Sequence, residues 1–163
     1  MPEILVVGYG NALRTDDGIG WHAADRLADD PRLDGVTVLR LHQLAPELSL
    51  DFSRVDAVVL VDATRDLAAG TFTLEPVERA DEGFPTWSHH LSPGSLIALA
   101  EELYGHAPEV FVLSVGVDSV EVGETLSPAL EAALPLVVDA VAAFVAERAA
   151  GAAAPGSAVP SHA

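Results

Sequence analysis

Two short apolar runs constrain the fold more than any other feature of this sequence. Residues 4–7 read ILVV, and residues 55–61 read VDAVVLV. A strand that is apolar at nearly every position is typical of a parallel sheet covered by helices on both faces, because neither side of such a strand meets water. The two runs therefore predict a buried, parallel sheet.

Helical patterns alternate with strand-like runs along the rest of the chain. Helices are expected at residues 18–28, 46–51, 92–104 and 127–148, and further strands at residues 36–41, 70–77 and 110–115. This alternation predicts an α/β fold, a three-layer α/β/α sandwich around a twisted, parallel-dominated sheet of about five strands. We expect residues 1–148 to form one domain and the Ala-, Pro- and Gly-rich residues 149–163 to form a disordered tail.

Charge and cysteine content exclude several classes of function. The 25 acidic and 8 basic residues give a formal net charge of −17, so the chain lacks the basic surface that nucleic acids and anionic membranes attract. No apolar run approaches the roughly 18–20 residues that span a bilayer, and the opening MPEILVV has no cationic signal-peptide start. Cysteine is absent, which excludes thiolate metal sites and cysteine nucleophiles. We expect a cytoplasmic monomer with neither nucleic acid nor membrane as a partner.

The loop after the first strand, residues 8–20 (GYGNALRTDDGIG), is the main candidate for a binding site. Ligands of open α/β sheets bind beyond the carboxyl ends of the strands, where the strand order reverses. Gly8 and Gly10 let the chain turn tightly and approach a ligand, and Asn11 can hydrogen-bond its own backbone. These three residues are candidate substrate contacts.

The same loop departs from a phosphate-binding loop. Leu13 stands where a dinucleotide fingerprint has its third glycine, and the adjacent carboxylates of Asp16 and Asp17 would repel a phosphate. Either acid alone could cap the helix that follows, but a helix start has one N-cap position. We interpret the loop as presenting a carboxylate to a metal ion or peptide, and Asp16 is a candidate substrate contact.

A third carboxylate and a pair of histidines complete a candidate metal site. Asp62 follows the apolar strand at 55–61; it either caps a turn or faces the same crevice as Asp17, if their strands are neighbours. His89 and His90 lie in a loop before a helix, and we expect one of them to point inward. Two carboxylates and one imidazole suit a borderline divalent ion such as Ni²⁺ or Zn²⁺, with positions left open for substrate.

Taken together, these segments resemble a known family. Residues 8–20 match the N-terminal signature of the hydrogenase maturation endopeptidases, G-x-G-N-x-L-x-x-D-[DE]-x-x-G. The similarity continues through VDAVVLVDA (55–63), SHHLSP (88–93) and SVGVDSVEVGETLSPAL (114–130), and covers about residues 3–147. It implies an aspartic-type endopeptidase that removes a C-terminal peptide from its partner, the nickel-loaded large-subunit precursor of a [NiFe] hydrogenase.

The resemblance also implies a ligand set. The family's nickel ligands correspond to Asp17, Asp62 and His89, which become the candidate catalytic and metal-binding residues. His89 is preferred because the family pattern is His-x-Leu, and a misalignment by one residue would make the ligand His90, which is otherwise a candidate substrate contact. The resemblance implies that nickel arrives with the substrate, and Zn²⁺ or Cd²⁺ would substitute in vitro.

The chain departs from the family pattern at two places. Asp17 stands where many members have Glu, and LHQLAPEL (41–48) replaces a Gly-Thr turn. The second departure makes His42 and Gln43 candidates for substrate contact. No nucleophile with an adjacent base is evident, and no G-x-S-x-G motif occurs. A non-catalytic nickel-sensing or chaperone module on the same fold is therefore the alternative.

Overall fold

A computed structural model of the protein describes residues 2–81 and 91–151. Its core is a five-stranded sheet of order β2-β1-β3-β5-β4. Four strands are parallel, namely β1 (Ile4–Tyr9), β2 (Thr37–Leu41), β3 (Ala57–Thr64) and β5 (Glu109–Gly116), and β4 (Phe72–Pro76) pairs antiparallel with β5 at one edge. The predicted parallel-dominated sheet is confirmed.

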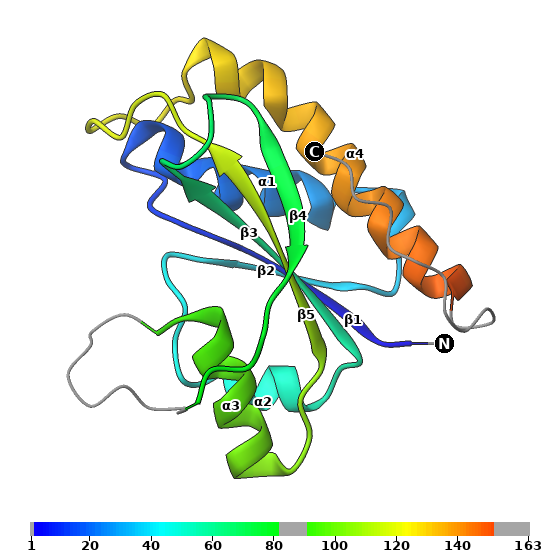
Figure 1. Ribbon diagram of the computed structural model, residues 1–163. Helices are drawn as coiled ribbons and strands as arrows, with labels where there is room; N and C mark the ends of the chain where they lie inside the picture. The colour runs from blue at the N-terminus through cyan, green and yellow to red at the C-terminus, as the bar shows by residue number, and fades with distance from the viewer. Residues whose placement is uncertain (1, 82–90, 152–163) are drawn as a thin grey trace.

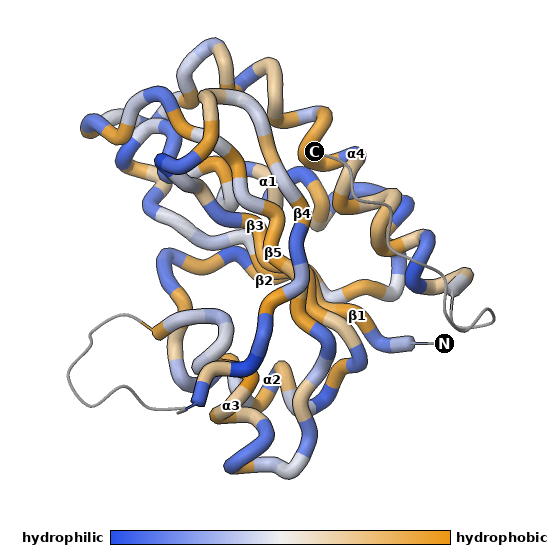
Figure 2. The backbone as a smooth tube through the Cα atoms, viewed as in Figure 1, coloured by the Kyte–Doolittle hydropathy of each residue, from blue (hydrophilic) through white to orange (hydrophobic). Residues whose placement is uncertain are grey.

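Four α-helices cover the two faces of the sheet (Figure 1). Helices α1 (Ile19–Ala28) and α4 (Pro128–Gly151) pack on one face, and α2 (Leu48–Ser53) and α3 (Pro93–Tyr104) on the other. Successive strand residues alternate between these layers, so that Val6 belongs to the first hydrophobic cluster and Val7 to the second. Figure 2 shows the apolar strands enclosed between the helices. The predicted three-layer sandwich is confirmed.

Several element boundaries differ from those expected. The helix predicted at 18–28 begins as a 3-10 turn, η1 (Thr15–Gly18), before α1. Strand β3 starts later than predicted, at Ala57. It also ends later than predicted, because Asp62 and the next two residues pair with β5. Helix α4 continues three residues beyond Arg148, because two alanines there favour helix. The rest of the predicted tail, residues 152–163, lies outside the described residues.

Helix α4 is long and apolar enough to cross a membrane by length and composition alone. Its most apolar 18-residue window has a mean hydropathy of 1.9, and half of that window is buried inside the protein. Leu130, Val137 and Val141 belong to the core cluster that α4 shares with α1 and the sheet. This burial is typical of the core helix of an α/β domain.

The strand order places a crevice at the carboxyl ends of strands β1 and β3. From β1 the chain moves outward to β2 and then returns to β3 on the other side of β1, so the loops after β1 and β3 diverge at the carboxyl ends of these strands. The loop after β1 also meets the segment after β5, through a bridge between Arg14 and Gly123. In Figure 1 these loops gather at the upper left.

Candidate functional site

Close packing between α1 and the sheet fixes the point where the loop after β1 leaves. A Cβ atom on Gly8 would lie 1.9 Å from the Gly20 carbonyl oxygen, and one on Gly20 would lie 2.4 Å from the Val61 carbonyl oxygen. Only glycine permits such an approach between two backbones. Gly8 is buried in β1 and lines neither of the pockets described below. The structure thus gives Gly8 a packing role, and its contact with substrate stays a prediction.

The next residues fold around the carboxylate of Asp17. Gly10 has a φ of +147°, and a Cβ atom there would lie 2.0 Å from the Asp17 carbonyl oxygen. The backbone N–H of Asn11 donates to Asp17 Oδ2 at 2.9 Å. The Asn11 side chain accepts from the Leu13 N–H at 2.9 Å, which is the local bond predicted from the sequence. Asp17 Oδ1 makes no hydrogen bond within residues 2–81 and 91–151, and is open to a ligand.

Asp16 points the other way, into the protein. Its carboxylate is fully buried and accepts backbone N–H groups from Asp118 (2.8 Å), Ser119 (2.9 Å) and Ser127 (2.7 Å), and the Ser127 hydroxyl at 2.8 Å. Burial alone raises the pKa of this carboxyl, but these hydrogen bonds outweigh it and hold the pKa below its ordinary value. Asp16 therefore clamps the loop after β1 to the segment after β5, in place of the predicted contact with substrate.

Asp62 is a part-buried carboxylate at the end of β3. Oδ2 accepts from the Tyr9 hydroxyl at 3.0 Å, and Oδ1 accepts from the Ala63 N–H at 2.7 Å. Burial raises the pKa of Asp62 to about 6, with a smaller increase from the negative charge of Asp17, and the two hydrogen bonds partly offset this. Burial and the adjacent Asp62 also raise the pKa of Tyr9, which keeps its hydroxyl protonated as a donor.

A cleft of about 410 Å³ joins the two carboxylates. Its lining consists of Tyr9, Gly10, Asp17, His42, Gln43, Leu44, Asp62, Leu91 and Pro93. The loops after β1 and β2 and the end of β3 therefore contribute to one cavity, together with the start of α3. The His42 ring stacks on Trp21 with their centroids 4.7 Å apart, which fixes the orientation of His42 at the rim.

The cleft brings together some predicted site residues and leaves others aside. Gly10, Asp17, Asp62, His42 and Gln43 line it. His89 and His90 lie outside the described residues. Within residues 2–81 and 91–151, no three metal-ligating side chains come together, so the two aspartates form the described part of the predicted ligand set.

Sequence reasoning missed several side chains of this region. Tyr9 was overlooked, although it is the last residue of β1 and so lies at the edge where ligands bind. The apolar side of the cleft, formed by Leu44 and Leu91, carries no motif that would mark it. Asp17 also borders a second, smaller pocket with Arg14 and Arg65, two residues that no sequence pattern connects.

Comparisons with known proteins rest on structure rather than sequence. No protein-family model matches this chain, and no curated protein matches it either. The [NiFe] hydrogenase maturation protease HycI from Thermococcus kodakarensis superposes with a TM-score of 0.71 at 21% identity, over 89% of this chain and 93% of that one. The hydrogenase maturating endopeptidase HybD from E. coli gives 0.63 at 25% identity, over 91% and 94%. An endopeptidase from E. coli gives 0.65 at 26% identity, again over 91% and 94%.

Proposed function

We propose that this chain is one of the [NiFe] hydrogenase maturation proteases, whose fold it shares, and that it is an endopeptidase that removes a C-terminal peptide from the nickel-loaded large subunit of a [NiFe] hydrogenase. One observation carries the proposal. Asp17, from the turn after β1, and Asp62, from the end of β3, lie where the strand order reverses and line one cleft in a fold shared with those proteases.

The two aspartates are proposed to hold the nickel that the substrate carries. Asp17 offers Oδ1, which has no hydrogen bond among the described residues, and each oxygen of Asp62 keeps a lone pair beyond the one used in its hydrogen bond. Two negative charges in one part-buried cleft repel each other, and this repulsion contributes to the raised pKa of Asp62. A divalent cation between them removes the repulsion. We assign the third position to His89.

Cleavage would use this metal contact to place the scissile bond. A bound divalent ion polarises a carbonyl oxygen or lowers the pKa of a water molecule, which makes attack on the peptide easier. The protein would contribute the position of the ion, through the fixed loop of Asp17 and the Tyr9 hydrogen bond to Asp62. Leu44 and Leu91 would pack on apolar groups of the bound segment, with His42 and Gln43 as its polar contacts.

The ligand set also predicts that the isolated protein binds metal weakly. Late first-row ions favour imidazole and thiolate over carboxylate, and Asp17, Asp62 and His89 provide one imidazole and no thiolate. We therefore propose that the protein recognises nickel already held by the large subunit. Calorimetry with Ni²⁺ on the protein alone should reveal no stoichiometric nanomolar site; such a site would contradict this part of the proposal.

The direct test is to incubate the protein with a nickel-loaded large-subunit precursor and follow the mass of the large subunit. We expect loss of a C-terminal peptide with the loaded precursor, no loss with the nickel-free precursor, and no loss with Asp17→Asn or Asp62→Asn. Exposed Asp51 supplies the matched control, and Asp51→Asn should cleave normally. Stable binding of the loaded precursor without any mass loss would instead indicate the non-catalytic alternative.

A further inference from the structure

A second pocket lies beside the cleft and shares Asp17 with it. This pocket of about 220 Å³ is formed by the end of β3, including Thr64, and by the loops after β1 and β5. This volume is enough for one side chain or a chain end. A peptide bound across Asp17 could therefore occupy the cleft on one side and this pocket on the other.

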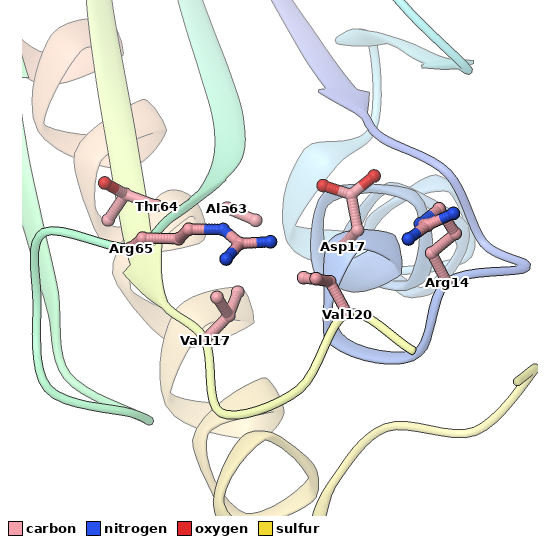
Figure 3. Close-up of a pocket in the computed structure, with 7 residues that line it drawn as sticks. All are labelled: Arg14, Asp17, Ala63, Thr64, Arg65, Val117 and Val120. Atoms are coloured by element: carbon pink, nitrogen blue, oxygen red, sulfur yellow. The ribbon is translucent and has the colours of Figure 1, made fainter. Parts of the chain in front are cut away.

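Two arginines give the second pocket its chemistry. Figure 3 shows the Arg65 guanidinium on one side of the Asp17 carboxylate and the Arg14 guanidinium on the other. Neither arginine forms an ion pair with a carboxylate in the described ranges. Arg26 and Arg54 also form none there, but Arg14 and Arg65 are brought together at one pocket. Two guanidinium groups at one pocket, neither neutralised by an ion pair among the described residues, form a place where an anion from outside the chain can bind.

Both arginines project from backbone that the fold holds in place. The Arg14 N–H donates to the Asn11 carbonyl at 3.0 Å, and Arg14 bridges to Gly123 across the neighbouring loop. Arg65 directly follows β3. Their Cα positions are therefore set on opposite sides of the pocket, and the conformational entropy lost on binding is mainly that of the two side chains.

The rest of the lining selects the kind of anion. Val117 and Val120 provide an apolar wall, which suits the aliphatic carbons next to a carboxylate. Guanidinium groups bind carboxylates in a planar, two-point geometry. Asp17 supplies one negative charge against the two arginines, and this charge is compensated when Asp17 holds a metal ion. A carboxylate-bearing peptide should therefore be bound best together with the ion.

We propose that Arg14 and Arg65 bind a carboxylate of the substrate peptide next to the scissile bond, either an acidic side chain or the terminal carboxylate of the segment to be removed. The assignment rests on the proposed function, because it takes the cleft at Asp17 as the place of cleavage. It adds a specificity contact in a pocket that shares Asp17 with the cleft but is not lined by His42 or Gln43.

The test measures kcat and KM for cleavage of the loaded precursor by the full-length protein. The double variant Arg14→Gln/Arg65→Gln should raise KM at least tenfold with kcat changed less than threefold, because charge-assisted hydrogen bonds to the bound peptide are lost. Arg54→Gln is the matched control and should leave KM unchanged. Arg54 is an exposed arginine just before β3, at the opposite end of this strand from Arg65.

Altered precursors identify the source of the carboxylate. In one, the acidic side chains near the scissile bond are changed to amides, and in the other the C-terminal carboxylate is amidated. The precursor that lacks the bound carboxylate should show the raised KM with the wild-type protein and no further increase with the double variant. An unchanged KM for the double variant would overturn the pocket assignment alone. The same holds if, for both altered precursors, the double variant raises KM further on top of the increase seen with the wild-type protein. A wild-type protein that cleaves no loaded precursor would overturn the proposed function with it.

Discussion

Replacing Asp62 by Asn should stabilise the protein while it abolishes processing. At neutral pH the folded protein holds an ionised carboxylate in a part-buried place where the pKa is about 6, compared with an ordinary value of 3.8. At about 1.36 kcal/mol per pH unit, this difference destabilises the folded state by about 3 kcal/mol once both states are ionised. Asparagine carries no charge, and the Tyr9 hydroxyl can turn to accept from its amide, so the variant would avoid this cost.

The pH dependence of the effect follows from the sign of the shift. Below the ordinary pKa of 3.8 the carboxyl is protonated in both states and wild type and variant should be equally stable. As the pH rises, the unfolded chain ionises first and the wild type loses stability relative to the variant, until the difference is complete above a pH of about 6. From the same two pKa values, the difference should be about 1.6 kcal/mol at pH 5 and about 3 kcal/mol at pH 7.5.

Thermal unfolding at pH 5.0 and pH 7.5 measures this difference. About 3 kcal/mol corresponds to a rise in Tm of roughly 6–12 °C for a chain of this size, and about half of that rise should remain at pH 5.0. Asp51→Asn, at an exposed position of α2, is the control and should shift Tm by no more than a degree or two at either pH. A variant at Asp62 that is less stable than wild type at pH 7.5, or a gain in Tm that does not shrink at pH 5.0, would show that burial of the charged Asp62 carboxylate does not destabilise the folded protein.

Three further changes test other parts of the structure. Asp16→Asn should lower the free energy of unfolding by about 2–4 kcal/mol in urea at pH 7, because an amide group cannot accept all the hydrogen bonds that Asp16 receives. Since those bonds lower the pKa of Asp16, the difference from wild type should fade as the pH drops below about 4. A difference that stays constant with pH would contradict the clamp. Gly20→Ala should lower the free energy of unfolding by about 1–3 kcal/mol or more, because the added Cβ would lie 2.4 Å from the Val61 carbonyl oxygen. Gly35→Ala is the control, because nothing lies within 4 Å of its Cβ position but φ is +83°. It measures backbone strain without a collision and should lower the free energy of unfolding less. Removing residues 152–163 should leave Tm within about 2 °C and processing unchanged, because the Ala-, Pro- and Gly-rich segment has little apolar surface to bury; a fall of more than about 4 °C would show that the segment docks.

The sheet could be predicted from the sequence because its strands carry their own signal. Continuous apolar runs at β1 and β3 are expected only where both faces of a strand are covered, and the helical patterns between them supply the covering layers. The cleft could be predicted for a related reason. Parallel strands end at the same edge, so Asp17 and Asp62 were expected to meet if β1 and β3 were neighbours, and the two strands pair directly.

The different roles of Asp16 and Asp17 could not be predicted in this way. The two acids are adjacent in a 3-10 turn, where successive side chains point in different directions, and local patterns do not reveal which one faces the solvent. The partners that hold Asp16 lie 102 to 111 residues further along the chain. The pairing of Arg14 with Arg65 was hidden for the same reason, since only the folded sheet brings these two loops to one pocket.

The clamp at Asp16 has a consequence for the order in which the protein acquires its site. Asp17 is held in a loop whose anchor, Asp16, binds the backbone and hydroxyl of Ser127, so a ribosome must synthesise more than three quarters of the chain before that anchor can form. Contacts of such long range form late in folding, because closing a long loop costs entropy before any bond is gained. A nascent or truncated chain that ends before Ser127 would hold both aspartates in its sequence and still lack the anchor that fixes the loop of Asp17 beside Asp62. Competence to cleave would therefore appear only after Ser127 has been added to the chain.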